Sequence, residues 1–168
     1  MKIRTETDND VGEIAALTYQ AFENHPHHEP GAKPTEHLIV ERLRNQHALS
    51  LSLVAEDESG IIGHIAFSAV MINGEPCNWF GLGPVSVQPN RQNEGIGKAL
   101  INQAMAIMQQ QGANGVVLLG EPQYYGRFGF KADAKLTLAD VPPEYFLVKR
   151  LDDNSDNGQV TYHPAFYG

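Results

Sequence analysis

Residues 85–98 of this 168-residue chain read Val-Ser-Val-Gln-Pro-Asn-Arg-Gln-Asn-Glu-Gly-Ile-Gly-Lys. An apolar strand that ends at Val87 runs here into a helix whose apolar residues keep one face as far as Gly112. Gly95 and Gly97 let the main chain approach a ligand closely, and the first N–H groups of a helix lack partners and carry partial positive charge. These features predict a phosphate-binding turn; the alternative is a glycine-containing turn that binds nothing.

The segments on both sides of this turn predict strands of one sheet. Upstream, residues 49–55 and 61–72 are joined by a hairpin turn, and Asn73-Gly74, the strongest short hairpin signal, leads into a third strand over residues 77–87. Downstream, residues 116–119 are wholly apolar, as expected of a strand buried on both faces beside a crossover helix. The sequence therefore predicts a three-stranded antiparallel meander followed by one parallel β-α-β crossover.

The rest of the chain completes an α+β fold with a mixed, mainly antiparallel sheet. Residues 2–7 predict a strand and 11–22 a helix, and a loop with three prolines then precedes a second helix capped at Thr35. The remaining expected elements are a short helix over 124–128, a strand over 130–138 and a terminal pair of strands over 145–151 and 158–162.

Length and composition predict a single domain over residues 1–168, located in the cytoplasm. Twelve basic against 20 acidic residues give a formal charge of −8, which repels nucleic acid. No apolar run approaches the roughly 20 residues of a membrane span, and the N-terminus lacks the apolar stretch of a signal peptide. Cys77, the single cysteine, has no partner for an internal disulfide. We therefore expect neither a nucleic-acid nor a membrane partner.

Two widespread phosphate loops do not fit the turn. A dinucleotide-binding fingerprint requires a glycine or alanine where Leu100 stands. A nucleoside triphosphatase loop requires a glycine at the position of Gln92 and a serine or threonine at that of Ala99. Both patterns fail at required positions.

The pattern Gln/Arg-x-x-Gly-x-Gly/Ala does fit, as Gln92-Asn93-Glu94-Gly95-Ile96-Gly97 after an apolar strand, and Tyr125-Gly126-Arg127-Phe128-Gly129-Phe130 follows the next strand. In this order the two motifs resemble those of the GNAT superfamily of N-acetyltransferases, and the wording around Tyr125 looks like its bacterial YhbS-like branch. The resemblance implies a twisted sheet with helices on both faces. It also implies that acetyl-CoA is the cosubstrate and that an amine accepts the acetyl group.

The resemblance also assigns roles to residues of this chain. Main-chain groups of Val85, Ser86 and Val87 are implied to bind the pantetheine arm and the acetyl carbonyl, on a strand that separates from its parallel neighbour; Gly81, Gly83 and Pro84 predict a bulge where that separation starts. The implied pyrophosphate site comprises Gln92, Asn93, Glu94, Gly95, Ile96, Gly97 and Lys98, and Arg91 and Lys98 are candidates to add charge there. Tyr125 is implied to be the general acid.

The general base and the acceptor stay open at this point. Glu121, Glu56 and His64 are candidates for the base, and Glu121 is the one we retain, although it is equally suited to cap the short helix that follows. His25, His27, His28 and Glu29 could bind zinc, but prolines split them, so we expect no metal. An unpaired, unreactive thiol is the simplest interpretation of Cys77.

Three functional hypotheses follow. The first is an acyl-CoA-dependent N-acetyltransferase, the second a non-catalytic sensor that binds acyl-CoA, and the third a domain that keeps only the fold. Because the C-terminal strands of such folds often mediate dimers, a homodimer is an open hypothesis as well.

Overall fold

The computed structural model describes residues 1–23 and 31–168. In this part of the chain the helices are α1 (Val11–Phe22), α2 (Glu36–Asn45), α3 (Ile96–Gln110) and α4 (Pro122–Tyr125). The strands are β1 (Lys2–Thr5), β2 (Leu51–Asp57), β3 (Gly60–Ile72), β4 (Glu75–Val87), β5 (Gly115–Leu119), β6 (Lys131–Ala132), β7 (Leu136–Leu138), β8 (Phe146–Arg150) and β9 (Gly158–Thr161).

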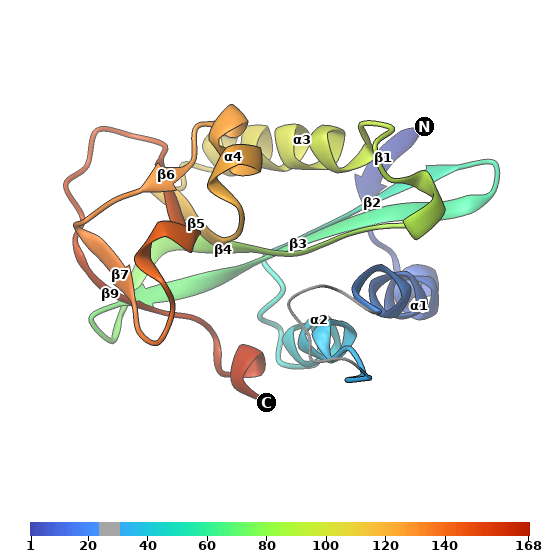
Figure 1. Cartoon of the computed structure of the whole chain (residues 1–168), viewed down its shortest axis with the longest axis horizontal. Helices are drawn as coiled ribbons and strands as arrows, with labels where there is room; N and C mark the ends of the chain where they lie inside the picture. Colours follow the sequence, from blue (N-terminus) through green and yellow to red (C-terminus); the bar gives the residue numbers. More distant parts are fainter. Residues whose placement is uncertain (24–30) are drawn as a thin grey trace.

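These strands form one sheet in the order β1-β2-β3-β4-β5-β8-β6, and β9 pairs with both β3 and β7. Every pairing is antiparallel except β4 with β5 and the short contact of β7 with β9. Helices α1 and α2 cover one face of the sheet, and α3 and α4 cover the other (Figure 1). The expected α+β fold, with its meander, its crossover through α3 and helices on both faces, is confirmed.

The apolar stripe of α3 packs on the centre of the sheet. Leu100, Ile101, Ala104 and Met108 are completely buried there. Removing a side chain of this size from water is worth about 1.5–3 kcal/mol, so this stripe fixes the helix on the sheet. Gly63 of β3 lets the helix come close, because a Cβ at this position would lie 2.8 Å from Ile96 Cγ2. The first turn of α3 is therefore held directly over β3.

A bulge in β4 has the position that Gly81, Gly83 and Pro84 predict. On β3, Phe67 faces Leu82 and Ile65 faces Val85, so β4 contributes one residue more than β3 over this interval. The extra residue lies directly before the last three residues of β4, which pair with β3 as far as Val87. The bulge therefore separates the half of β4 that pairs with β5 from the half that does not.

The C-terminal third departs from expectation in two places. The strand expected over 130–138 is split into β6 and β7, because Asp133 accepts a hydrogen bond from the Lys135 N–H with Oδ1 and thereby forms a turn. The strands expected to form a terminal pair do not pair with each other: β8 pairs with β5 and β6, whereas β9 pairs with β3 and β7.

The loop between β8 and β9 explains this second difference. Arg150 donates from Nη1 to Asn154 Oδ1 at 2.7 Å and from Nη2 to the carbonyl of Asp156 at 2.9 Å. Trp79 Nε1 donates to Asp156 Oδ2 at 2.8 Å. These bonds fold the polar loop back over Arg150 and Trp79, and β9, which follows the loop, pairs with β3 and β7 instead of with β8.

Two helix starts also differ in detail from the sequence-based expectation. The Thr35 side chain makes no capping hydrogen bond at α2; its carbonyl accepts the Leu38 N–H instead. The helix expected over 124–128 is α4 followed by a 3₁₀ turn over Gly126–Phe128. Neither difference moves an element of the site.

Candidate active site

The parallel pairing of β4 with β5 is short. It joins Trp79, Phe80 and Gly81 to Gly115, Val116 and Val117 and then stops. Beyond Gly81, β4 continues along β3, whereas β5 continues along β8. A gap therefore opens in the middle of the sheet, at the end of β4 that leads into α3.

The phase of the β3–β4 ladder decides which main-chain groups of β4 face this gap. The N–H of Gln88 donates to the carbonyl of Ile62 at 2.9 Å. Because hydrogen-bonded and non-bonded pairs alternate in an antiparallel ladder, Ser86 is bonded to β3, and the N–H and C=O groups of Val85 and Val87 point away from it. Val85 and Val87 are thus the residues whose main chain faces the gap. The Ser86 side chain is buried on the face of the sheet opposite to the side chains of Val85 and Val87.

The turn before α3 leaves a row of main-chain donors without acceptors. Asn93 and Gly95 have φ angles of 67° and 86°, a left-handed conformation that asparagine tolerates and glycine adopts freely. The first hydrogen bond of the helix runs from the Ala99 N–H to the carbonyl of Gly95 at 3.0 Å. Within the described ranges, the N–H groups of residues 93–98 donate to no protein atom. They form an anion-binding terminus of the kind that phosphate occupies.

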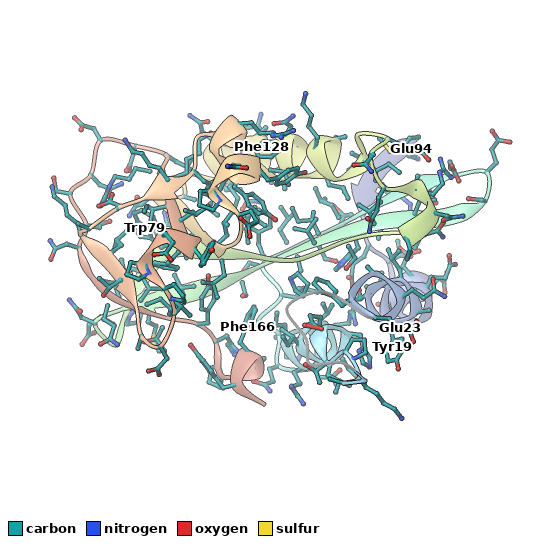
Figure 2. All side chains as sticks on the ribbon, in the orientation of Figure 1. Tyr19, Glu23, Trp79, Glu94, Phe128 and Phe166 are labelled. Atoms are coloured by element: carbon teal, nitrogen blue, oxygen red, sulfur yellow. The ribbon has the colours of Figure 1, made fainter. Side chains whose placement is uncertain are left out.

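Arg91 holds this turn in place rather than projecting into solvent. Its Nε lies 3.0 Å from Glu94 Oε1, and its Nη1 lies 2.9 Å from Asp57 Oδ2 on the β2–β3 hairpin. Hydrogen bonds from Ser59, followed by the one from Arg91, lower the pKa of Asp57 to about 2, so this carboxylate stays charged at neutral pH. Figure 2 shows Glu94 on the turn that leads into α3. The guanidinium is therefore bound by two carboxylates, whereas Lys98 is exposed beside the turn and Arg127, also exposed, lies with its Cζ 4.7 Å from the centre of the Tyr124 ring.

Two adjoining cavities follow the gap. The first, which we call the turn cavity, has a volume of about 620 Å³. Its lining comprises Ala21, Phe22, Val85, Val87, Arg91, Gln92, Asn93, Gly95, Ile96, Gly97, Lys98, Tyr124 and Arg127. The second, the gap cavity, has a volume of about 900 Å³. Its lining comprises Phe22, Glu36, Leu82, Gly83, Pro84, Val85, Leu119, Gly120, Glu121, Tyr124, Tyr125, Pro142 and Tyr145. Because Phe22, Val85 and Tyr124 belong to both, the cavities form one continuous groove.

The two tyrosines of α4 lie along this groove. Tyr125 lines the gap cavity, and its ring fills the space that a Cβ on Gly120 would need. Its ring meets that of Tyr124 edge to face, with centroids 4.9 Å apart. Burial raises the pKa of Tyr125 to about 12, so its phenol keeps its proton at neutral pH. Tyr124 reaches the turn, since its Oη lies 3.5 Å from where a Cβ on Gly97 would stand.

The sequence model of the acetyltransferase (GNAT) domain matches residues 2–132. This chain belongs to the GNAT family. Uncharacterized N-acetyltransferase YhbS of Escherichia coli K12 is 35% identical over 173 residues, covering 99% of this chain and 98% of that protein. A second Escherichia coli K12 protein, uncharacterized N-acetyltransferase YjhQ, is 29% identical over 126 residues, covering 73% of this chain and 65% of that protein.

Solved structures agree over almost the whole chain. A GNAT family acetyltransferase from Brucella melitensis, in complex with acetyl-CoA, is 44% identical with a TM-score of 0.85, covering 98% of this chain and 97% of that one. YhbS from Escherichia coli, in complex with CoA, is 33% identical with a TM-score of 0.89, and the match covers 99% of this chain and 92% of that one. The GNAT family is thus established by both sequence and structure.

The three candidate bases of this GNAT chain are in different surroundings. Glu121 is exposed and lines the gap cavity; its carbonyl accepts the N–H groups of Tyr124 and Tyr125, but its side chain makes no capping bond. Glu56 is bound by Arg4, with Nε 2.8 Å from Oε1, and lies outside both cavities. His64 is fully buried, with Nε2 2.8 Å from Ser52 Oγ, and lines neither cavity. Of these three, Glu121 alone lines the groove.

The buried His64 makes a prediction about pH. Burial, the largest effect, together with Arg44 lowers the pKa of His64 from 6.5 to about 4, against an opposing effect of Glu6. Between these values the unfolded chain binds a proton that the folded chain does not, so stability is retained above pH 6.5 and lost as pH falls towards 4. We expect the free energy of unfolding to fall by roughly 1 kcal/mol per pH unit from this residue.

Urea unfolding at several pH values between 7 and 4 measures this effect, and the variant His64→Gln isolates it. The amide of glutamine can still bond Ser52 but does not titrate. The slope of stability against pH should be smaller in the variant. An equal slope in both proteins would contradict the assignment.

Several groove residues were not anticipated from the sequence. Phe22 ends α1, Glu36 begins α2, and Pro142 and Tyr145 precede β8, so the groove gathers segments that lie far apart along the chain. Tyr124 is the one with a sequence signal, because it adjoins Tyr125 in the second motif. For the others, no local pattern sets them apart from ordinary surface or core residues.

The remaining candidates are placed as follows. His25, His27, His28 and Glu29 lie outside the described residues. In residues 1–23 and 31–168, no group of three histidine, cysteine, aspartate or glutamate side chains is arranged to hold a metal. Cys77 donates from Sγ to the carbonyl of Val70 at 3.2 Å, and burial raises the pKa of its thiol, which suits an unreactive thiol. None of the described helices has both the length and the apolar character needed to cross a membrane.

Proposed function

We propose that this chain is an N-acetyltransferase that transfers the acetyl group of acetyl-CoA directly to an amine. The observation that carries the proposal is the row of main-chain donors without acceptors at residues 93–98, beside the gap where β4 leaves β5. A diphosphate needs several such donors, and a thioester needs a path from them to the reacting centre. The continuous groove of the turn and gap cavities offers both.

The residues present fit this cosubstrate. The N–H groups of Asn93, Glu94, Gly95, Ile96, Gly97 and Lys98, together with Gln92 at the turn, would hold the pyrophosphate. The two β4 valines that face the gap, Val85 and Val87, would bind the pantetheine amides and the acetyl carbonyl. We assign the adjacent Ser86 a packing role, because its main chain is bonded to β3. The side chains of Gln92 and Glu94 need no part in binding, since the main chain supplies the donors.

The chemistry requires one bond to form and one to break. The lone pair of a neutral amine attacks the thioester carbonyl carbon, a C–N bond forms, and the C–S bond breaks to release CoA. The amine loses one proton, and the departing sulfur gains one. We propose that Tyr125 donates to the sulfur, since its phenol is protonated at neutral pH and lines the gap cavity. Desolvation raises the pKa of Tyr125 and would also raise the pKa of the CoA thiol in the same groove. The pKa values of the proton donor and of the group that receives the proton therefore stay comparable.

Glu121 is our candidate for the group that receives the proton from the amine. Its exposed carboxylate lines the same cavity as Tyr125, from the start of α4. A carboxylate near an ammonium ion attracts the cation and, directly or through water, can take its proton. This role is separate from coenzyme binding.

A thiol-release assay tests the proposed function. The full chain is incubated with acetyl-CoA and a panel of primary amines, free CoA is measured, and the product mass is determined. We expect release that depends on both enzyme and amine, with a product heavier by one acetyl group. Binding of acetyl-CoA without release for any amine would contradict catalysis and support a sensor.

Three further properties stay predictions. A cytoplasmic location is an expectation from the sequence alone, and the lack of a nucleic-acid partner is an expectation from its net charge of −8. A homodimer is an expectation from folds of this type. Light scattering of the purified chain would determine its mass in solution.

A further inference from the structure

The Tyr125 hydroxyl is not held in place by a hydrogen bond of its own. Within the described part of the chain it has no hydrogen-bonded protein partner. Its ring contacts those of Phe128 and Phe130, with centroids 6.4 and 6.3 Å apart, and all three rings are carried by the same stretch of chain. The position of the phenol in the gap cavity therefore depends on how firmly this stretch is fixed to the rest of the fold.

The stretch that carries Tyr125 is a short helical segment. The four residues of α4 continue directly into the three of the 3₁₀ turn, so that the segment spans residues 122–128. Isolated helices below about 12–15 residues are marginal in water, so a segment of this length needs contacts with other elements. Just before it, the Gly120 N–H donates to the Tyr145 carbonyl at 3.0 Å. The start of the segment is thus fixed, and its end needs an anchor as well.

Lys149 of β8 bonds the end of the segment. Its Nζ donates to the carbonyl of Phe128, the last residue of the 3₁₀ turn, at 2.7 Å. Figure 2 labels Phe128 beside α4. A lysine in this place satisfies a carbonyl that has no helical partner, and its charge suits the negative end of the segment. Within the described ranges Lys149 forms no ion pair with a carboxylate, so the Phe128 carbonyl is what its ammonium binds.

A glycine of the second motif makes room for this lysine. Gly129 follows the 3₁₀ turn with a φ angle of 92°, which glycine adopts freely. A Cβ at this position would lie 3.2 Å from Lys149 Cε and 3.3 Å from its Nζ, which is closer than ordinary contact. Lys149 itself pairs with Val116 of β5, inside the sheet. The hydrogen bond therefore ties the end of the segment to the sheet.

We propose that Lys149 is a positioning residue for the general acid. By holding the Phe128 carbonyl it keeps the segment in place, and with it the Tyr125 phenol that donates to the departing sulfur. Lys149 lines neither cavity and takes no part in the proton transfer. A proton donor acts only within hydrogen-bond reach, and a misplacement of about 1 Å can cost on the order of a hundredfold in rate. This inference rests on the proposed function and adds a residue to its machinery.

Lys149→Met tests this role, because methionine keeps an unbranched apolar stem and removes the donor. We expect kcat for thiol release from acetyl-CoA, with the most active amine of the panel, to fall about tenfold. The Kd of acetyl-CoA should stay within about twofold, because the main-chain donors before α3 are untouched. Calorimetry gives the binding-competent fraction of each preparation, so rates are compared per folded chain.

Lys131→Met is the matched control. Lys131 is a lysine of β6, the strand that pairs with β8, and its exposed side chain bonds none of the described residues. Its loss removes a positive charge from the same region and leaves the Phe128 carbonyl bonded. The kcat of this variant should stay close to that of the parent chain.

A double-mutant cycle separates an effect on Tyr125 from a general structural effect. In a Tyr125→Phe background there is no phenol to position, so Lys149→Met should change kcat less than about twofold. The same tenfold loss in both backgrounds would show that Lys149 acts on something other than Tyr125 and would overturn the inference. A parent-like kcat in Lys149→Met would overturn it too.

The outcomes distinguish this inference from the proposed function. If Tyr125→Phe loses rate and Lys149→Met does not, the positioning role is wrong and acetyl transfer with Tyr125 as general acid stands. If Tyr125→Phe keeps the parent kcat, the general acid and the positioning role are both wrong, whereas acetyl transfer stands. If no amine supports thiol release, the proposed function and this inference are both wrong.

Discussion

Replacing Gly97 by leucine is expected to abolish measurable binding of acetyl-CoA. A Cβ at Gly97 would lie 3.5 Å from Tyr124 Oη and 3.7 Å from Val87 Cγ2, which is ordinary contact, so the backbone tolerates the substitution. The rest of the leucine side chain would occupy the turn cavity where we propose the pyrophosphate docks. Hydrogen bonds to charged groups are worth about 1.5–3 kcal/mol each, so losing two raises Kd by roughly 10²–10⁴.

Gly12 supplies the matched control. It is the second residue of α1, as Gly97 is of α3, and a Cβ there would meet nothing within 4 Å. Gly12→Leu should keep the affinity of the parent chain in isothermal titration calorimetry, and circular dichroism should show both variants folded. Wild-type affinity in a folded Gly97→Leu protein would remove the basis of the proposed function.

Tyr125→Phe is expected to lower kcat by about 10²–10⁴ while the Kd of acetyl-CoA stays nearly unchanged. Within the described part of the chain the Tyr125 hydroxyl has no hydrogen-bonded protein partner, whereas its ring packs against Tyr124, Phe128 and Phe130. Phenylalanine keeps this packing and removes only the proton donor. Steady-state kinetics and calorimetry on the same preparation separate rate from affinity.

Tyr124→Phe serves as the control for this variant. Tyr124 has the same chemistry and lies on the same helix, but it reaches the turn at Gly97. Its kcat should therefore stay close to that of the parent chain. Unchanged kcat in Tyr125→Phe would refute the general acid. If the chain were a non-catalytic sensor, neither variant and not the parent chain would show turnover. The two variants therefore also distinguish an acetyltransferase from an acyl-CoA sensor.

Local sequence patterns were enough to predict the centre of the fold. The Asn73-Gly74 hairpin, the apolar stripe of α3 and the glycines before it act over a few residues, and each imposes one local structure. The expected pairing of β8 with β9 was wrong, because the loop between them is folded by bonds to Arg150 and to Trp79, which lies far away in sequence. Contacts of that kind leave no periodic pattern in the chain.

Sequence located one part of the candidate site and did not locate the other. The turn around Gly95 could be located from sequence, since its residues are contiguous. Sequence did not distinguish Ser86 from Val85 and Val87, because the phase of a ladder is set by the partner strand. Nor did it identify Phe22, Glu36 and Tyr145, which come together only when α1, α2 and the segment before β8 pack around one gap.

The additional residue in β4 determines on which face of the sheet each later side chain of the strand lies. Leu82 and Val85 are three positions apart, yet each pairs with a β3 residue whose side chain belongs to the same buried cluster beneath α3. If the same residues paired without a bulge, side chains would alternate unbroken, Ser86 would turn into the apolar layer, and its amide would replace those of the flanking valines at the opening. A single-residue deletion near Gly83 would remove the bulge and leave Val85, Ser86 and Val87 opposite the same β3 residues, so the ligand-facing donors depend on how many residues separate Leu82 from Val85.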